Sequence, residues 1–308
     1  MEFENPQIPE GINVTDEHPL KGLLQLVIGL VAIIAIILFV LHYSVQYLVH
    51  YIPFEYEVAM TEEVEFFQME DQNQQLSDQE LNIQAQLQLL ANDLSNHMDL
   101  PDEMAITVHY SSAETVNAFA TLGGHIFMYK GLIDQLDSQE ALSMVMAHEI
   151  AHVKLRHPIS SLGEGVTLAV LASVITGATG SSAGEALISS SSNLGLMKFS
   201  RDQEQDADFL AAQAINSKYG NILGAQSLFN TFHSLTANEQ SKTLVIFLSH
   251  PHSNERWEDL HAAAEENFWS VSGQLTPLPT HLLQENSCLL YTSPSPRDLS
   301  TSRMPSSA

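Results

Sequence analysis

Residues 138–158 read SQEALSMVMAHEIAHVKLRHP. Their apolar residues recur at helical spacing and Ser138 is a favourable N-cap, so a long helix is predicted from there to about Arg156. We expect His157-Pro158 to end this helix, because the residue before a proline is disfavoured in helical backbone.

Within this predicted helix, His148, Glu149 and His152 form the pattern H-E-x-x-H. Residues four apart lie on one face of a helix, about 6 Å apart along its axis, so both imidazoles can hold one zinc ion. Glu149 is then the predicted general base for a water molecule that zinc activates. The pattern also occurs by chance, but here apolar residues flank it and allow the other helix face to be buried.

A catalytic zinc ion usually needs a third protein ligand. The metzincin pattern is excluded, because Leu155 and Pro158 stand where it requires glycine and histidine. The other solution is a glutamate from a second helix, and Glu204 offers it, with Asp208 one turn further on able to hydrogen-bond a ligand histidine. The alternative is that these acids form a solvated helix face, as we expect for Asp206.

Four strings make the chain resemble the HtpX-like and CAAX-prenyl-protease family of membrane zinc metallopeptidases. They are NAFATLGGHIFMYKGLI (117–133), MAHEIAHVKLRHP (146–158), SRDQEQDAD (200–208) and SHPHSNER (249–256). They occur in the family's order and cover roughly residues 75–268. One departure is Leu122, where members commonly have proline before the paired glycines, and it is expected to alter a turn and leave the chemistry intact.

The resemblance implies a zincin-type, gluzincin-like metalloprotease fold, mainly α with a small β-sheet or hairpin, behind one N-terminal transmembrane helix. It implies one zinc ion per chain, with His148, His152 and Glu204 as its ligands. It also implies that Glu149 is the catalytic acid/base and that Asp208 is the supporting carboxylate. The single anchor makes the chain similar to bacterial envelope quality-control members of the family.

Three further residues are candidates for the site. His250 is a candidate to stabilise the oxyanion or to occupy the open zinc position in a resting state, the alternative being a surface-loop histidine. Arg256 either faces the cleft or pairs with Glu255 or Asp259, and the favoured expectation is a helix-surface or structural role. His125 is the third candidate, and the strand that it begins is predicted to pair with an extended substrate by β-augmentation.

The rest of the domain is predicted from local signals. Ser77 and Glu80 form a capping box before an amphipathic helix that we expect Pro101 to stop. The other predicted elements are strands at 105–110 and 118–129, a buried helix within 166–175, and helices at 201–216 and in pieces up to about 267.

An anchor is predicted at residues 23–41, which are apolar except for Gln25 and long enough to cross a bilayer as a helix. Residues 1–22 are acidic and no signal-peptide cleavage site follows the apolar run, so the helix is expected to be retained. Lys21 is the only basic residue near either end. On that single charge, the positive-inside rule places the N-terminus in the cytoplasm and the large domain outside.

Three segments follow the anchor. Residues 42–75 are predicted to be a juxtamembrane linker, and residues 76–286 the zinc metallopeptidase domain. Residues 287–308 are rich in serine and proline and differ abruptly from the rest, so we interpret them as a translated sequencing adapter and expect the native chain to continue differently. The aromatic residues expected to form a belt at the membrane surface are Tyr43, Tyr47, Tyr51 and Phe54.

Composition limits the classes of partner. The chain has 308 residues, with 11 Lys and Arg against 37 Asp and Glu, and a formal net charge of -26. No nucleic-acid partner is expected, because phosphate binding needs clustered basic residues. The single cysteine excludes a disulfide framework and a cysteine-based zinc site.

The sequence therefore predicts a membrane-anchored zinc endopeptidase that cleaves unfolded or misassembled proteins and contacts the bilayer through residues 23–41. By the resemblance, the expected location is the bacterial inner membrane, with the peptidase domain facing the periplasm. The alternative is a latent or chaperone-like binding scaffold on the same fold. A purely structural anchor protein is disfavoured, because it would have no use for this order of potential ligands and base.

Overall fold

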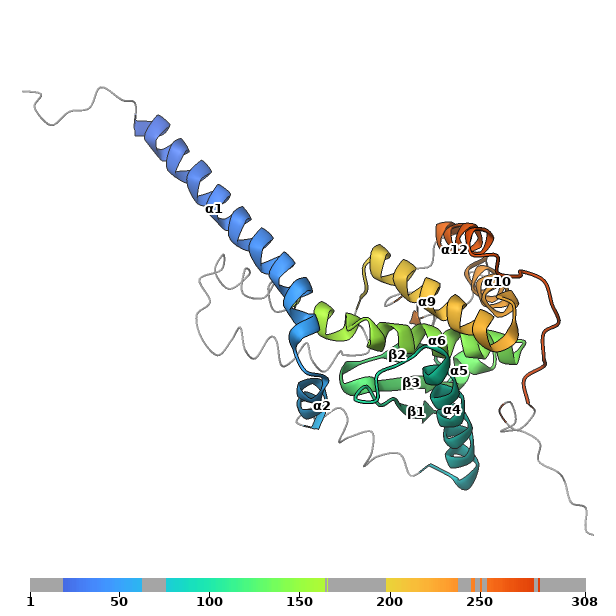
Figure 1. Ribbon diagram of the computed structural model, residues 1–308. Helices are drawn as coiled ribbons and strands as arrows, with labels where there is room; N and C mark the ends of the chain where they lie inside the picture. The colour runs from blue at the N-terminus through green and yellow to red at the C-terminus, as the bar shows by residue number, and fades with distance from the viewer. Residues whose placement is uncertain are drawn as a thin grey trace, which may run out of the picture.

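The computed structural model describes residues 19–62, 76–163, 165, 198–237, 245–246, 250, 254–279 and 282. A long N-terminal helix projects from a body in which helices pack around a small sheet (Figure 1). The α-helices are α1 (Pro19–Leu48), α2 (Phe54–Glu62), α4 (Asp78–His97), α5 (Lys130–Ile133), α6 (Gln139–Lys154), α9 (Arg201–Tyr219), α10 (Leu223–Ala237) and α12 (Asn254–Glu266). The strands are β1 (Thr107–Ser111), β2 (Ala118–Ala120) and β3 (His125–Tyr129), and the short 3-10 helices are η1 (Val49–Tyr51) and η2 (Leu122–Gly124). The predicted buried helix within 166–175 and the predicted tail at 287–308 lie outside the described residues.

Helix α6 lies at the centre of the body and carries the H-E-x-x-H pattern, as predicted. Every residue from Glu140 to Val153 is buried, because α4, α9 and α10 all pack against this helix. The Ser138 side chain caps it by accepting a hydrogen bond from the Ala141 N–H at 3.2 Å.

The end of α6 differs from the prediction. The helix stops at Lys154, and Arg156 has left-handed backbone with φ of 60°. His157 and Pro158 then begin a second helical stretch at residues 157–163 instead of ending the first. Proline is tolerated there because the backbone N–H groups in the first turn of a helix have no acceptor within the helix, so a residue without an N–H loses no hydrogen bond.

The small sheet has the strand order β1-β3-β2, and the predicted hairpin is confirmed. β2 pairs antiparallel with β3, and β1 pairs parallel with it on the other side. The prediction that the strand beginning at His125 receives a substrate by β-augmentation is therefore wrong, because β3 is the central strand and both of its edges are paired. β2 is an outer strand of this sheet and lies against α6.

The paired glycines make the turn between β2 and β3. Gly123 and Gly124 have φ of 69° and 79°, a region that favours glycine. A Cβ at Gly124 would lie 2.2 Å from the carbonyl oxygen of Ala105, so the close approach also requires glycine. Leu122, where relatives were expected to have proline, lies buried in η2.

Helix α4 begins as predicted and ends slightly earlier. Ser77 and Glu80 form the expected capping box. The helix stops at His97, ahead of Pro101, and Asp99 follows with φ of 47°. The residues of α4 that face the core are Ile83, Leu87, Ala91 and Leu94.

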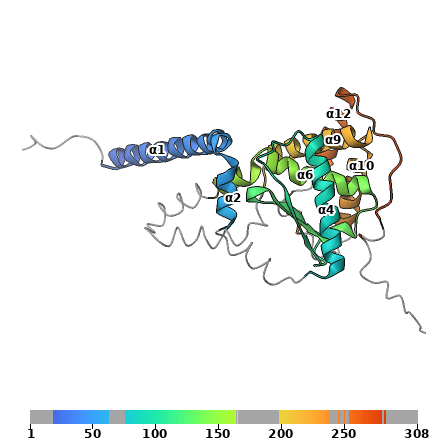
Figure 2. The ribbon, with the colours of Figure 1, turned by 60° about the horizontal axis from the view of Figure 1, so that its bottom comes forward.

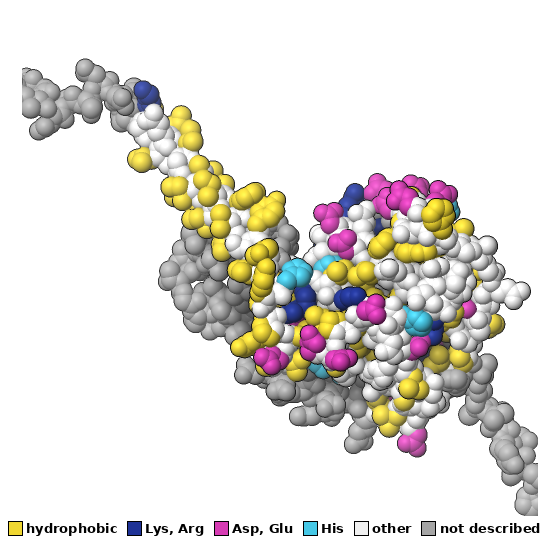
Figure 3. All heavy atoms as spheres, viewed as in Figure 1, with side chains coloured by type: hydrophobic (Ala, Val, Ile, Leu, Met, Phe, Trp, Pro, Cys, Tyr) yellow, Lys and Arg dark blue, Asp and Glu magenta, His cyan; other side chains and the backbone are white. Residues whose placement is uncertain are grey.

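Helix α1 contains the predicted anchor. Leu20–Leu41 is apolar enough and long enough to cross a membrane, and none of it is buried against the body. Figure 3 shows hydrophobic side chains exposed along this helix, and Figure 2 shows α1 pointing away from the body with α2 where the two meet.

The predicted linker is largely helical in the part that the structure describes. Residues 42–48 continue α1, residues 54–62 form α2, and residues 63–75 lie outside the described part. Phe54 is buried in the core cluster, so its prediction as part of an aromatic belt is wrong. The three predicted tyrosines of the belt are exposed.

Candidate metal centre

The structure brings four potential metal ligands together inside the body. His148 and His152 come from α6, Glu204 comes from α9, and His250 precedes α12. One donor atom from each residue lies within 4.8 Å of the others, and all four side chains are buried. Three of them are the ligands expected from the sequence, and the fourth was a less favoured candidate.

The distances suit a small tetrahedral metal. Bonds of about 2.0–2.1 Å place two ligands of a tetrahedral zinc about 3.3 Å apart. The Nε2 atoms of His148 and His152 are 3.1 Å apart, and the Glu204 carboxylate oxygens lie 3.5 and 3.6 Å from them. The Nδ1 atom of His250 is 3.3 Å from His148 Nε2. Two or three nitrogens with one carboxylate are a donor set that zinc accepts.

The local sequence explains how α9 presents its acids to α6. The Ser200 side chain and Gln203 form a capping box that begins α9 just before Glu204. Asp208 follows one turn later and therefore shares a face with Glu204. Both are buried, because α9 packs along α6. The alternative that they form a solvated face is excluded, and Asp206 between them is exposed, as expected.

Asp208 orients the first histidine. Its Oδ1 lies 3.0 Å from His148 Nδ1, so Nδ1–H donates to Asp208 and the Nε2 atom faces the cluster. Burial alone would lower the pKa of His148, but hydrogen bonds with Asp208 and Glu204 outweigh it and raise that pKa to about 10. Two carboxylates, those of Asp208 and Glu204, therefore face the His148 ring and place negative charge beside the cluster.

His157 orients the second histidine, a contact that the sequence analysis missed. Its Nδ1 lies 2.8 Å from His152 Nδ1, and the Phe199 ring stacks on His152 with centroids 4.0 Å apart. Burial, with a smaller effect from His148, lowers the pKa of His157 to about 4, so its ring is neutral and can accept the N–H of His152. A histidine five residues after the second motif histidine is the only sequence signal for this role.

Arg256 joins the two acids of α9, which corrects its predicted place on a helix surface. Its Nε and Nη2 donate to Asp208 at 2.7 and 2.8 Å, and its Nη1 lies 2.8 Å from Glu204 Oε2. Arg256 and His148 hold the pKa of Asp208 below its ordinary value although burial would raise it. The predicted partners, Glu255 and Asp259, bind other residues of α9.

His250 is buried, which excludes the alternative of a surface-loop histidine. Its Nδ1 lies 2.9 Å from Glu204 Oε1, and its Nε2 lies 3.6 Å from Glu149 Oε1. It thus stands at the fourth corner of the cluster and beside the predicted base. Within the described residues, Glu149 Oε2 is buried without a hydrogen-bond partner, and such an atom suits a bound water or substrate group.

His125 does not join the cluster. Its ring lies 2.9 Å from His109 of β1 and 3.4 Å from the Thr61 hydroxyl of α2, measured between the nearest polar atoms. The structure therefore gives this candidate a place at the contact of α2 with the sheet.

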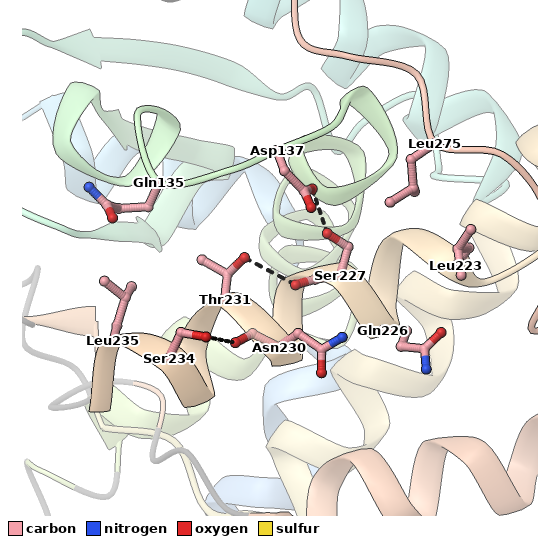
Figure 4. Close-up of a pocket in the computed structure, with 10 residues that line it drawn as sticks. All are labelled: Gln135, Asp137, Leu223, Gln226, Ser227, Asn230, Thr231, Ser234, Leu235 and Leu275. Atoms are coloured by element: carbon pink, nitrogen blue, oxygen red, sulfur yellow. Dashed lines mark hydrogen bonds between the residues drawn. The ribbon is translucent and has the colours of Figure 1, made fainter. Parts of the chain in front are cut away.

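A small apolar cavity of about 20 Å³ adjoins His148 and Glu149. Its apolar lining consists of Val145, Leu228, Phe229, Phe232 and Ile246. A larger hollow of about 410 Å³ lies away from the cluster, along α10 (Figure 4). Three of its polar side chains bond within the hollow or along their own helix, with Ser227 donating to Asp137, Thr231 to the Ser227 carbonyl and Ser234 to the Asn230 carbonyl. The reactive groups therefore lie at the smaller cavity.

Comparison with known proteins agrees with the metallopeptidase pattern of the sequence and the cluster. Residues 79–264 match the model of peptidase family M48. The chain is 28% identical over 183 residues to the Beta-barrel assembly-enhancing protease of Yersinia pestis, a match that covers 56% of this chain and 35% of that protein. It is 29% identical over 148 residues to Metalloprotease YcaL of Escherichia coli, covering 46% and 55% of the two chains. It is 27% identical over 150 residues to Mitochondrial metalloendopeptidase OMA1 of Schizosaccharomyces pombe, covering 48% and 44%. The matches thus span between about a third and a little over half of these relatives.

Proposed function

This chain belongs to peptidase family M48, and on that basis we propose that it is a membrane-anchored zinc endopeptidase that cleaves unfolded or misassembled proteins. The observation that carries the proposal is the buried cluster of two helical histidines and a glutamate, with Glu149 beside it. Two of the three relatives are named as a metalloprotease and a metalloendopeptidase, and the third is named as a protease that enhances β-barrel assembly, which supports protein substrates.

In this proposal His148, His152 and Glu204 hold one zinc ion. Zinc bound there would act as a Lewis acid and lower the pKa of a water molecule to about 7. Glu149 would take a proton from the attacking water and deliver it to the leaving amine. Asp208 would keep His148 in the tautomer whose Nε2 faces the metal.

His250 favours a second, related proposal, that the enzyme rests in a latent form. A catalytic zinc site needs an open position, and His250 lies where a fourth ligand would close it. Its Nε2 also lies near Glu149, so the same side chain blocks the place of the attacking water. Movement of His250 out of the cluster would open the site.

We assign the anchor to residues 23–41, the peptidase domain to residues 76–286 and an adapter-derived tail to residues 287–308. The exposed apolar surface of α1 supports the anchor, and Lys21 at the N-terminal end of the apolar run supports a periplasmic peptidase domain by the positive-inside rule. The contacts of α2 with the body extend the folded unit into the segment that was expected to be a linker.

The test uses the full chain in detergent and compares wild type with Glu149→Gln and Glu258→Gln, the latter an exposed control. Casein cleavage is measured with and without added zinc, and zinc content is measured in parallel. We expect zinc-dependent cleavage by wild type and the control, and its loss in Glu149→Gln with zinc still bound. A folded protein that binds no zinc would overturn the proposal, whereas zinc binding without cleavage in all three would favour a latent enzyme or a binding scaffold.

A further inference from the structure

The chain enters the body immediately after the membrane helix. Val49, the first residue after α1, is 3% exposed and packs with Leu122 and Ile159, and Ile52 packs at the same cluster. We call residues 49–62, which include η1 and α2, the collar. The collar is folded against the body, which distinguishes it from a flexible linker.

A buried ion pair ties the collar to the end of α6. Glu57 accepts a hydrogen bond from Arg156 Nε at 2.6 Å, and both side chains are at most 5% exposed. Arg156 Nη1 also donates to the Ile52 carbonyl at 2.9 Å, and its guanidinium lies 5.5 Å from the centre of the Phe54 ring. Arg156 lies four residues after His152, just beyond the end of α6, so the collar is bound to the segment that directly follows a predicted metal ligand.

The collar is also fixed to the turn of the sheet. Glu57 accepts the Gly123 N–H at 3.4 Å, and a Cβ at Gly123 would lie 3.1 Å from the Thr61 hydroxyl. At Gly124, a Cβ would lie 3.4 Å from the Phe54 ring. This turn follows β2 and contacts α6, so the collar is held both by the segment after α6 and by the turn that packs beside that helix.

A short helical segment, residues 42–48, separates the membrane span from the collar. The apolar span ends at Leu41, and α1 continues without a break to Leu48. At 1.5 Å per residue, residues 42–48 extend about 10 Å beyond the span. A flexible linker over the whole of residues 42–75 would instead have allowed the body to move over a much larger distance.

We propose that the collar holds the metal centre at a set distance from the bilayer, so that the enzyme cleaves unfolded segments lying close to the membrane surface in preference to distant or dissolved chains. The inference rests on the proposed anchor and peptidase activity. It adds a substrate class, namely unfolded polypeptide near the membrane from which it emerges.

The test uses the full chain in liposomes together with lipid-linked peptides that carry one unfolded cleavable segment. Helical spacers of (EAAAK) repeats place that segment at about 15 to 60 Å from the lipid, at 1.5 Å per residue. We expect wild type to cleave at the best short spacer at least tenfold faster than at the longest one. Dissolved casein is cleaved in parallel as the measure of basal activity.

Two insertions between Leu41 and His42 make the test specific. A seven-residue helical insertion adds about 10 Å while nearly preserving the helix phase, so the best spacer should lengthen by about 10 Å. A flexible insertion of about 20 glycine and serine residues should reduce the dependence on spacer length to less than twofold. Casein cleavage should be equal in all three proteins.

Equal rates at every spacer in wild type, or identical profiles in all three proteins, would overturn the inference while normal casein cleavage left the proposed function intact. Absence of casein cleavage by both wild type and His250→Ala with zinc bound would instead overturn both.

Discussion

The histidines of the metal centre are positioned by residues that do not belong to the H-E-x-x-H pattern. Asp208 contacts Nδ1 of His148, and His157 contacts Nδ1 of His152. Each contact directs the Nε2 atom of its histidine toward the cluster. Partners of this kind typically change metal affinity by 10- to 100-fold when they are removed.

We therefore predict that His157→Phe, which keeps an aromatic ring but removes the nitrogen, weakens zinc binding about 10- to 100-fold. The affinity is measured by competition with a chelating dye. His261→Phe changes a partly exposed histidine of α12 and should leave the affinity unchanged. Equal zinc affinity in His157→Phe and wild type would show that Nδ1 of His152 needs no partner.

His250 gives a second prediction for a single residue. If it closes the site in the resting state, His250→Ala should increase casein cleavage, by about tenfold if about a tenth of wild-type molecules are open. A histidine that stabilised the oxyanion would give the opposite result, with a loss of about 100-fold or more. The initial rates of the two proteins at equal zinc occupancy decide between these roles.

Among the secondary-structure elements, α2 depends on the Glu57–Arg156 ion pair. Burial raises the pKa of Glu57, although Arg156 lowers it, so desolvation offsets much of the attraction within the pair. Removing one partner is still costly, because the other charge then remains buried without compensation.

We predict that Glu57→Gln lowers the free energy of unfolding by about 3 kcal/mol, the lower end of the cost of breaking a buried ion pair. Glu55→Gln changes an exposed carboxylate on the same helix and should stay within about 0.5 kcal/mol of wild type. Denaturant unfolding of the three proteins in detergent measures the difference. If Glu57→Gln unfolded at the same denaturant concentration as Glu55→Gln, α2 would not be held by this ion pair.

The contact between α10 and α6 depends on Gly224. A Cβ at this position would lie 2.4 Å from the Glu140 carbonyl oxygen, and backbone atoms cannot move aside as a side-chain end can. We predict that Gly224→Ala destabilises the protein by about 1–3 kcal/mol, as overpacking does in cores. Thermal unfolding tests this, with Ser234→Ala on the exposed side of α10 as the control. An unchanged melting temperature in Gly224→Ala would mean that the two helices can separate at little cost.

In the whole molecule, the candidate metal centre connects α6, α9 and His250, which lies four residues before α12, and these parts are distant in the sequence. Because the cluster exists only in the folded state, zinc binding should stabilise the fold. At a free zinc concentration about 100 times Kd, the gain is about 2.7 kcal/mol.

We predict that a chelator lowers the melting temperature of wild type by about 5–10 °C. Glu204→Gln, which alters a proposed ligand, should show little change on chelation, whereas Glu149→Gln should behave like wild type. Differential scanning calorimetry in detergent measures the shifts. A large chelator effect in Glu204→Gln would exclude Glu204 as a ligand.

Local signals in the sequence were sufficient for several elements and for most of the site. Helix α6, the caps at Ser77 and Ser138, and the paired-glycine turn were predicted because each depends on residues within a few positions. The spacing of His148 and His152 on one helix likewise required only the helical period.

Contacts between distant residues were needed for the rest. Arg256 could pair with several acids by its sequence position, and packing of α12 on α9 selected Asp208, 48 residues away. The strand order, which places β3 in the centre of the sheet, also depends on distant contacts. Glu57 binds Arg156, 99 residues away, and this contact makes part of the predicted linker a part of the body. Periodicity and capping are encoded within one turn of chain, whereas the choice among equivalent charged or strand partners depends on which surfaces are buried together in the folded molecule.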